Sequence, residues 1–168
     1  MIKELNMDYG RYKNKKDMPA FQYYFRLAQK SGGVKQFLYR ILLKLTKMKN
    51  CIELSYSTNI GGGLYIGHPY CITINPEAIL GKNINIHKGV TIGQENRGSR
   101  KGTPTIGNSV WIGVNATIVG KINIGDDVLI APNTYVNCDV PAHSVVFGNP
   151  CIIKPRDNAT EGYINCII

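Results

Sequence analysis

A repeat of six residues runs from Asn59 to Val140, and this period limits the folds that are open to the chain. An aliphatic residue recurs, mostly at intervals of six, and the residue after it is usually small or turn-forming. The recurring aliphatic residues are Ile60, Ile66, Ile74, Leu80, Ile86, Ile92, Ile106, Ile112, Ile118, Ile124, Ile130 and Val136. Neither a helix nor an ordinary strand has this period, whereas a solenoid coil with flat faces and sharp corners does.

We therefore predict a mainly β protein, a β-helix in which three hexads form one triangular coil. The aliphatic residue points inward, and small residues such as Gly61 and Gly113 relieve the crowding at the next corner. About five such coils would stack and bury the aliphatic side chains in continuous columns. A β-sandwich with strands rich in Val and Ile is the alternative, but its strands would alternate with a period of two.

Residues 1–50 lack the repeat and form a predicted N-terminal helical segment. Residues 1–17 are polar and rich in lysine, so we expect a loosely ordered lead-in and no secretory signal. Amphipathic helices are predicted from Ala20 to about Ser31 and from Val34 to about Lys49. The second has an apolar stripe and a basic opposite face, so it could lie on an anionic membrane or pack against another part of the protein. Packing is the commoner use of such a helix.

The composition restricts the partners. The formal net charge of +9 in 168 residues suggests an anionic partner. Charged residues are only 18% and no RNA- or DNA-binding motif is present, so nucleic acid is not expected. The 5 cysteines include no CxxC pair and suit reduced thiols in the cytoplasm. No apolar run approaches the length of a membrane span.

The hexads also carry a family resemblance. Ile112-Gly113-Val114-Asn115-Ala116 and Ile124-Gly125-Asp126-Asp127-Val128 resemble the hexapeptide repeat of the left-handed parallel β-helix acyltransferases. The run from Ile60 to Lys154 is most similar to serine O-acetyltransferases and to related sugar O-acetyltransferases of surface-polysaccharide synthesis. The resemblance implies a left-handed β-helix domain over residues 51–154, a C-terminal tail over 155–168, and a homotrimer with each active site between two subunits. It also implies acetyl-CoA as co-substrate and serine or a sugar as the small-molecule acceptor.

The resemblance implies His68 as the general base. Acetyl transfer to a hydroxyl needs a group that accepts the hydroxyl proton, and imidazole suits this task near neutral pH. In the family a carboxylate one coil earlier orients this histidine, and the ungapped alignment places Glu53 there. We therefore predict a dyad of Glu53 and His68. An acyl-cysteine route through Cys71 is the weaker mechanism, because nothing marks that thiol as activated.

The predicted acceptor-binding residues lie beside His68 and in an insertion that interrupts the hexads, Gln94 to Thr105. They are Gly67, His87, Arg97, Arg100, Lys101 and Thr103. Two of them depart from the serine acetyltransferase pattern, because Gly67 replaces an aspartate and Thr103 replaces a histidine. Both departures favour a neutral sugar hydroxyl, while the cations of the insertion leave serine open.

The resemblance places the coenzyme along the corners of successive coils. The predicted cofactor-binding residues are Gly93, Gln94, Gly113, Val114, Ala131, Pro132, Ile152 and Lys154. A backbone N–H near Gly93 and Gln94 could stabilise the oxyanion, an effect of about 3 kcal/mol in well-studied enzymes. No metal is expected, because zinc would need three converging histidines and His143 is too far along the stack from His68 and His87. A non-catalytic β-helix scaffold is the remaining alternative.

Overall fold

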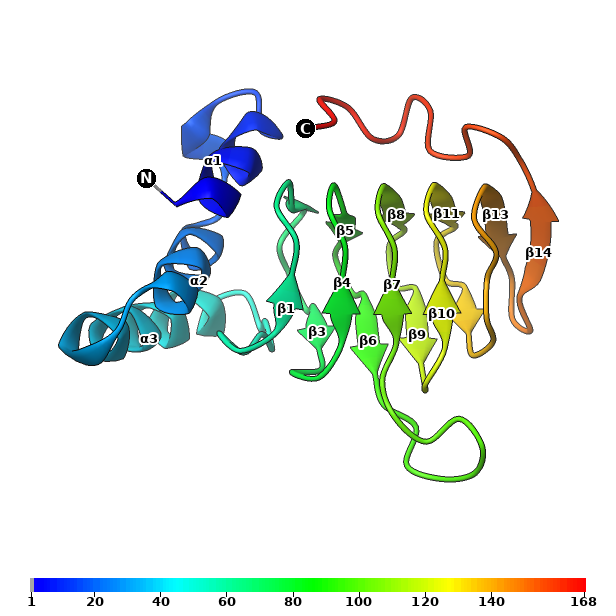
Figure 1. Ribbon diagram of the computed structural model, residues 1–168, viewed down its shortest axis with the longest axis horizontal. Helices are drawn as coiled ribbons and strands as arrows, with labels where there is room; N and C mark the ends of the chain where they lie inside the picture. Colours follow the sequence, from blue (N-terminus) through cyan, green and yellow to red (C-terminus); the bar gives the residue numbers. More distant parts are fainter. Residues whose placement is uncertain (1) are drawn as a thin grey trace.

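The computed structural model describes residues 2–168, and three narrow sheets of parallel strands wrap into a β-helix (Figure 1). The first sheet contains, in spatial order, β1 (Asn59–Ile60), β4 (Ile79–Leu80), β7 (Thr105–Ile106) and β10 (Asn123–Ile124). The second contains β2 (Tyr65–Gly67), β5 (Asn85–His87), β8 (Val110–Ile112), β11 (Val128–Ile130), β13 (Ser144–Phe147) and the antiparallel edge strand β14 (Ile152–Pro155). The third contains β3 (Thr73–Ile74), β6 (Thr91–Gly93), β9 (Thr117–Val119) and β12 (Tyr135–Val136). The predicted β-helix is confirmed.

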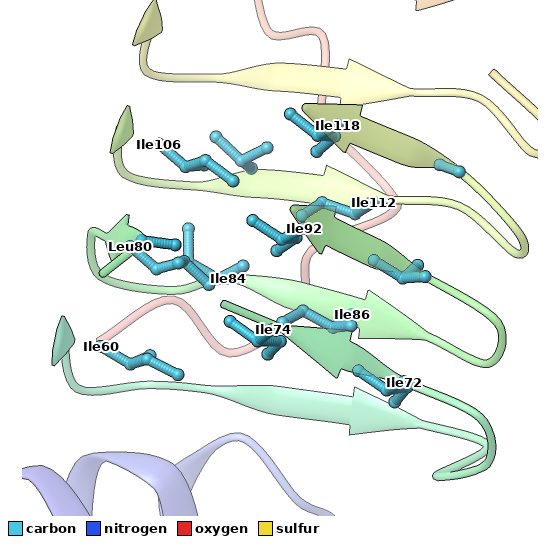
Figure 2. Packing of buried hydrophobic residues seen from close by; sticks show 14 of the residues in the cluster. Ile60, Ile72, Ile74, Leu80, Ile84, Ile86, Ile92, Ile106, Ile112 and Ile118 are labelled. Atoms are coloured by element: carbon cyan, nitrogen blue, oxygen red, sulfur yellow. The ribbon is translucent and has the colours of Figure 1, made fainter. Parts of the chain in front are cut away.

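The aliphatic residues of the hexads form the core in columns (Figure 2). In the second sheet Ile86 pairs with Ile66 on one side and with Ile112 on the other. The recurring aliphatic side chains are all buried, and burial of one such side chain contributes about 1.5–3 kcal/mol. The core is therefore continuous along the stack, and each coil depends on its neighbours for burial.

The small residues after the aliphatic positions are required by the close approach of neighbouring coils. A Cβ atom on Gly81 would lie 2.5 Å from the carbonyl oxygen of Gly107. A Cβ atom on Gly113 would lie 2.6 Å from the backbone nitrogen of Pro132. At these corners the neighbour is rigid backbone, so a side chain would push the coils apart.

A helical cap covers the end of the stack that begins with β1 (Figure 1). We define it as residues 3–48, and it contains α1 (Lys3–Gly10), the 3₁₀ turn η1 (Lys15–Asp17), α2 (Ala20–Lys30) and α3 (Gly33–Met48). The two predicted amphipathic helices are confirmed as α2 and α3. The prediction of a loosely ordered lead-in over 1–17 is wrong, because α1 is a regular helix with Leu5 and Asp8 buried. Met1 lies outside the described residues.

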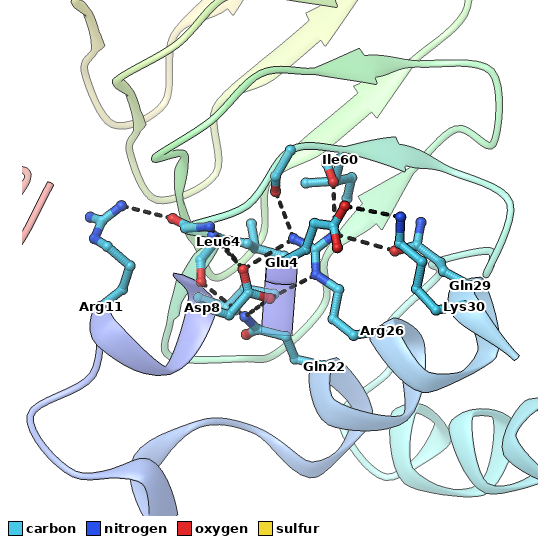
Figure 3. Close-up of polar contacts among 12 residues, drawn as sticks. Glu4, Asp8, Arg11, Gln22, Arg26, Gln29, Lys30, Ile60 and Leu64 are labelled. Carbon is cyan, nitrogen blue, oxygen red and sulfur yellow. Dashed lines mark hydrogen bonds and ion pairs between the residues drawn. The ribbon is translucent and has the colours of Figure 1, made fainter. Parts of the chain in front are cut away.

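A buried polar network centred on Asp8 attaches the cap to the first coil (Figure 3). The Asp8 carboxylate accepts hydrogen bonds from the backbone N–H groups of Gly63 and Leu64, each at 2.9 Å. It also pairs with Arg26, whose Nε lies 2.8 Å from Oδ2. The Arg26 guanidinium in turn donates to the carbonyl oxygens of Ile60 and Gly61 at 2.7 and 2.6 Å. Residues 1–17 are fixed by polar contacts and show no hydrophobic period. The sequence pattern therefore could not predict helix α1.

The C-terminal tail after β14 runs back along the stack toward α1 (Figure 1). The carboxylate of Asp127 accepts hydrogen bonds from the backbone N–H groups of Ala159 and Thr160 at 3.0 Å. Further along, the Nδ2 atom of Asn85 donates to the carbonyl oxygen of Tyr163, and the Nε atom of Arg11 donates to that of Asn165. The tail therefore joins the last coil to the helical cap.

The insertion after β6 leaves the stack as a projecting loop before β7, as predicted (Figure 1). Among the helices of residues 2–168, none has both the length and the apolar character needed to cross a membrane.

Candidate active site

His68 lies at the corner that follows β2, at the edge of an open hollow of about 670 Å³. Its backbone has a φ of 55°, which is uncommon for a residue with a side chain. The preceding strand ends at Gly67, and the carbonyl oxygen of His68 accepts a hydrogen bond from the N–H of Tyr70 at 2.8 Å. The corner therefore fixes the backbone of His68, while its side chain is exposed to the hollow.

His87 occupies the space next to Gly67. The two residues are paired in neighbouring strands, and a Cβ atom on Gly67 would lie 2.8 Å from both Cε1 and Nδ1 of His87. The His87 ring centroid is 6.5 Å from that of His68 and 4.8 Å from that of Trp111. Because the His87 ring lies against its backbone, Gly67 cannot be exchanged for a larger residue without moving that ring.

The surroundings of His87 favour the neutral form of its imidazole. Burial lowers its pKa from the ordinary value of 6.5, and the neighbouring His68 lowers it further. Its Nε2 atom is buried and has no hydrogen-bond partner within residues 2–168. A neutral imidazole nitrogen can accept or donate one hydrogen bond, so Nε2 is a buried polar atom whose hydrogen-bonding capacity is unused among the described residues.

The helical cap builds the opposite wall of the hollow. The hydroxyl of Tyr12 accepts a hydrogen bond from the N–H of Ile66 at 2.9 Å and donates one to Gln22 at 2.7 Å. Its ring packs on Tyr65 with a centroid distance of 4.9 Å, and burial raises the pKa of Tyr12. Tyr12 therefore holds the cap against the strand that ends beside His68.

The charged side chains on this wall were not predicted from the sequence. Lys16 and Asp17 of the cap and Lys49, directly after it, line the hollow, and Asp17 is the one carboxylate among its lining residues in the described chain. Residues 1–17 show no hydrophobic period, so no pattern in the sequence indicated that the cap lines this hollow. Between Ile66 and Ile74 the hexads contain two extra residues, around His68 and Pro69. A count of one coil from Gly67 that includes these two residues would have placed His87 beside it.

Glu53 lies in a second hollow of about 610 Å³, on the side of the third sheet. Arg40, Lys47 and Gly93 also line this hollow. Burial lowers the pKa of Lys47, and Glu53 opposes that shift. Glu53 and His68 line different hollows, and within residues 2–168 no hydrogen bond or ion pair joins them, so the dyad stays a prediction.

The projecting loop makes its contacts with its own coils. Glu95 and Gly102 form a short antiparallel bridge, and the backbone N–H of Lys121 donates to the carbonyl oxygen of Arg100 at 2.8 Å. The hydroxyl of Thr103 donates to the carbonyl oxygen of Glu77 at 3.1 Å. The predicted acceptor residues of the loop, Arg97, Arg100, Lys101 and Thr103, are not among the residues that line the hollow of His68.

The predicted coenzyme residues follow the corners of the coils. Gly113 and Val114 come directly after β8, and Ala131 and Pro132 come directly after β11, so both pairs continue the corner of His68. Gly93 ends β6, and Gln94 accepts a hydrogen bond from Asn75 at 3.3 Å. Ile152 and Lys154 lie on the edge strand β14, where the Nζ atom of Lys154 is 5.7 Å from the Phe147 ring centroid. The close packing of Gly113 on Pro132 accounts for that glycine without a ligand.

His143 does not join the other two histidines. Its Nδ1 atom lies 2.9 Å from the carboxylate of Asp127, which is bound to the C-terminal tail. Within residues 2–168 no group of three or more His, Cys, Asp or Glu side chains could hold a metal ion. The expectation that the protein binds no metal stays a prediction.

The fold and the corner histidine define the class of hexapeptide-repeat transferases, and the comparisons agree. Residues 103–138 match the family model "Bacterial transferase hexapeptide (six repeats)". A serine acetyltransferase of Helicobacter pylori is 35% identical over 121 residues, which cover 72% of this chain and 71% of that protein.

Two solved structures extend the similarity beyond the repeats. The soybean serine acetyltransferase apoenzyme has a TM-score of 0.66 and 27% identity, over 80% of this chain and 55% of that one. The Neisseria gonorrhoeae serine acetyltransferase in complex with serine has a TM-score of 0.66 and 27% identity, over 90% of this chain and 66% of that one. The chain belongs to the serine acetyltransferase family of hexapeptide-repeat transferases, and it spans from about half to two thirds of these two solved chains.

Proposed function

We propose that the protein is an O-acetyltransferase of the serine acetyltransferase type, with acetyl-CoA as donor. The observation that carries the proposal is the position of His68, which is fixed at a coil corner and exposed in a hollow. A general base must reach the hydroxyl proton that it abstracts, and an open hollow allows an acceptor to approach. Family membership supports the same activity.

In the proposed mechanism the acceptor hydroxyl donates its proton to the His68 imidazole. The hydroxyl oxygen attacks the thioester carbonyl, and the tetrahedral intermediate collapses with loss of the CoA thiolate. His68 then returns the proton to the thiolate. Backbone N–H groups near Gly93 and Gln94 are the proposed oxyanion donors, and they would come from a neighbouring copy in the proposed trimer, because Gly93 does not line the hollow of His68 in one chain. Glu53 is the proposed orienting carboxylate. The direct reaction needs no cofactor besides the acetyl-CoA that it consumes.

The donor would lie along the corner that continues from His68. Gly113, Val114, Ala131 and Pro132 offer backbone groups to the extended pantetheine arm, and Ile152 and Lys154 lie farther along the stack. Lys154 is exposed and could reach an anionic phosphate.

L-Serine is the first acceptor that we propose, because the solved Neisseria relative is a complex with serine. A sugar hydroxyl is the second. The observation that favours it is the position of His87, whose ring packs against Gly67 where the family pattern has an aspartate. That carboxylate would hold the amino group of serine, and a neutral imidazole cannot replace its charge. Arg97, Arg100, Lys101 and Thr103 would contact the acceptor from the loop.

The test is release of free CoA from acetyl-CoA with L-serine, with nucleotide-linked sugars, and without acceptor. Release that depends on serine would support the first acceptor and show that Gly67 and Thr103 are tolerated. Release that depends only on a sugar would support the second. Release with neither, although acetyl-CoA binds, would contradict both acceptors and revive the non-catalytic scaffold.

In this proposal the chain also associates with two more copies of itself and makes a peripheral contact with a membrane. No nucleic acid is proposed as a partner. The trimer would bring the loop of one copy to the hollow of another, which accounts for the separation of the loop from His68 in one chain. Sedimentation should then give three times the mass of the single chain, and a monomer would contradict it. We propose a cytoplasmic location on the strength of the unpaired cysteine pattern.

A further inference from the structure

Helix α3 has two opposite faces, and one of them is uncovered. Leu43 is buried in the core on the side that faces the rest of the protein. Six apolar side chains on the other side are between 41% and 85% exposed: Val34, Phe37, Leu38, Ile41, Leu45 and Met48. Their spacing of three and four residues places them on one stripe of the helix. We call these six residues the α3 stripe, and it extends for most of a helix about 24 Å long.

The charged residues of α3 itself have one sign, and Glu53 is the one carboxylate among the described residues that line the adjoining hollow. From Met18 to Ile52 the sequence contains no Asp or Glu and seven Lys or Arg residues. At 100° per residue, Lys35 and Lys49 lie on one side of the stripe and Arg40 and Lys44 on the other. All four are exposed, and none of them has an ion pair within residues 2–168. An apolar stripe with cations on both sides can bury its apolar side chains while the cations reach outward.

This charge distribution indicates which kind of partner the α3 stripe would bind. In a twofold contact, between two copies or between two of the proposed trimers, the same cationic face would meet itself, and like charges would lie together. A lipid bilayer with anionic headgroups offers an apolar interior to the stripe and negative charge to the flanking lysines. A helix with a polar opposite face lies in the plane of such an interface and does not cross it, in agreement with the membrane-span result above.

We propose that α3 docks on the surface of an anionic lipid membrane, with the α3 stripe inserted among the headgroups and acyl chains. The proposal does not depend on acetyl transfer. Arg40, Lys44 and Met48 also line the hollow that contains Glu53 and Gly93, so docking would bring that hollow close to the membrane surface. If the proposed function holds, the arrangement suits an acceptor that is itself anchored to lipid.

The test is co-sedimentation of the full chain with vesicles of phosphatidylcholine, with and without phosphatidylglycerol. We expect binding to the anionic vesicles only, and weaker binding as the salt concentration rises. The double variant Phe37→Glu with Leu45→Glu should lose binding by more than about tenfold, because two charges would enter the acyl region. Lys44→Gln and Lys49→Gln should each weaken binding by about fivefold.

The matched control is Ile167→Glu, which also replaces an exposed apolar side chain but lies on the C-terminal tail. It should bind anionic vesicles like the wild type, and circular dichroism should show that every variant keeps its helices. No binding of the wild type to anionic vesicles, or equal binding to vesicles without phosphatidylglycerol, would overturn the proposal. So would a double variant that binds normally but sediments with a lower mass than the wild type, because the α3 stripe would then be an interface between copies.

Discussion

Different kinds of contact stabilise the β-helix and fix the helical cap in place. In the β-helix, Ile86 meets Ile66 and Ile112 at the same level of each coil, so one short-range period sets both burial and register. In the cap, Asp8 joins Arg26, Gln22 and the backbone of Gly63, which are far apart in the sequence. The comparison teaches that a repeat gives redundancy, whereas the cap adds to the apolar contacts of Phe21, Phe25 and Leu43 a few buried polar groups that no other residue duplicates.

The largest effect is expected in the cap. Asp8→Ala would leave Arg26 buried without its counter-ion, and loss of one partner of a buried pair costs about 3–5 kcal/mol. The cap should separate from the first coil, with early proteolysis of residues 2–50 while the β-helix persists. Limited proteolysis and thermal melting would measure this. The control is Glu4→Gln, which removes a partly exposed pair with Lys30 and should change little.

A single core substitution in the β-helix should cost slightly less and act on the whole stack. Ile112→Ala removes a buried side chain from the centre of a column, and such changes cost about 2–5 kcal/mol. Because neighbouring coils share one core, urea unfolding should shift as one transition. A separate early transition of the cap in this variant, with the β-helix unchanged, would contradict the division of the molecule into these two regions.

A smaller effect is expected where the two regions meet beside His68. Gly67→Ala would place a methyl group against the His87 ring, and overpacking of this kind costs about 1–3 kcal/mol. Activity should fall because the ring moves into the hollow. His87→Ala combined with Gly67→Ala should recover most of the lost stability, and a double-mutant cycle measures this coupling. Additive losses would show that the two residues do not interact.

The smallest effect concerns pH. Burial lowers the pKa of His87 in the folded protein, so the unfolded chain binds more protons once the pH falls below the ordinary value of 6.5. The contribution of neutral His87 to the free energy of unfolding is complete above pH 6.5 and declines as the pH falls below that value. His87→Gln should therefore flatten the decrease in unfolding free energy between neutral and mildly acidic pH. The free energy of unfolding would be measured by denaturant titration at each pH. If its dependence on pH were unchanged in the variant, a group other than His87 would be responsible.

The sequence predicted those parts of the fold that follow a period. The β-helix, its core columns and the projecting loop were predicted from the hexads, and α2 and α3 from their amphipathic spacing. Helix α1 was missed because its fixing residues, Asp8 and Arg11, are polar and act across long sequence separations. Nothing local marks a carboxylate whose partners lie 14 to 56 residues away.

The candidate site was predicted only in part, for a similar reason. His68 followed from the resemblance, and the structure places it in a hollow. The walls of that hollow depend on how Tyr12 and Asp17 return to the first coil, which no spacing in the sequence specifies. The proximity of His87 to Gly67, in contrast, follows from the hexads once the two extra residues around Pro69 are counted.

The central claim is that His68 abstracts the acceptor proton during acetyl transfer. The direct measurement is the rate of CoA release, with whichever acceptor supports turnover, for the wild type, His68→Ala and the control His143→Gln. We predict a loss of about 10²–10⁴-fold for His68→Ala with unchanged acetyl-CoA binding, and a nearly normal rate for His143→Gln. Full turnover by His68→Ala would contradict the account.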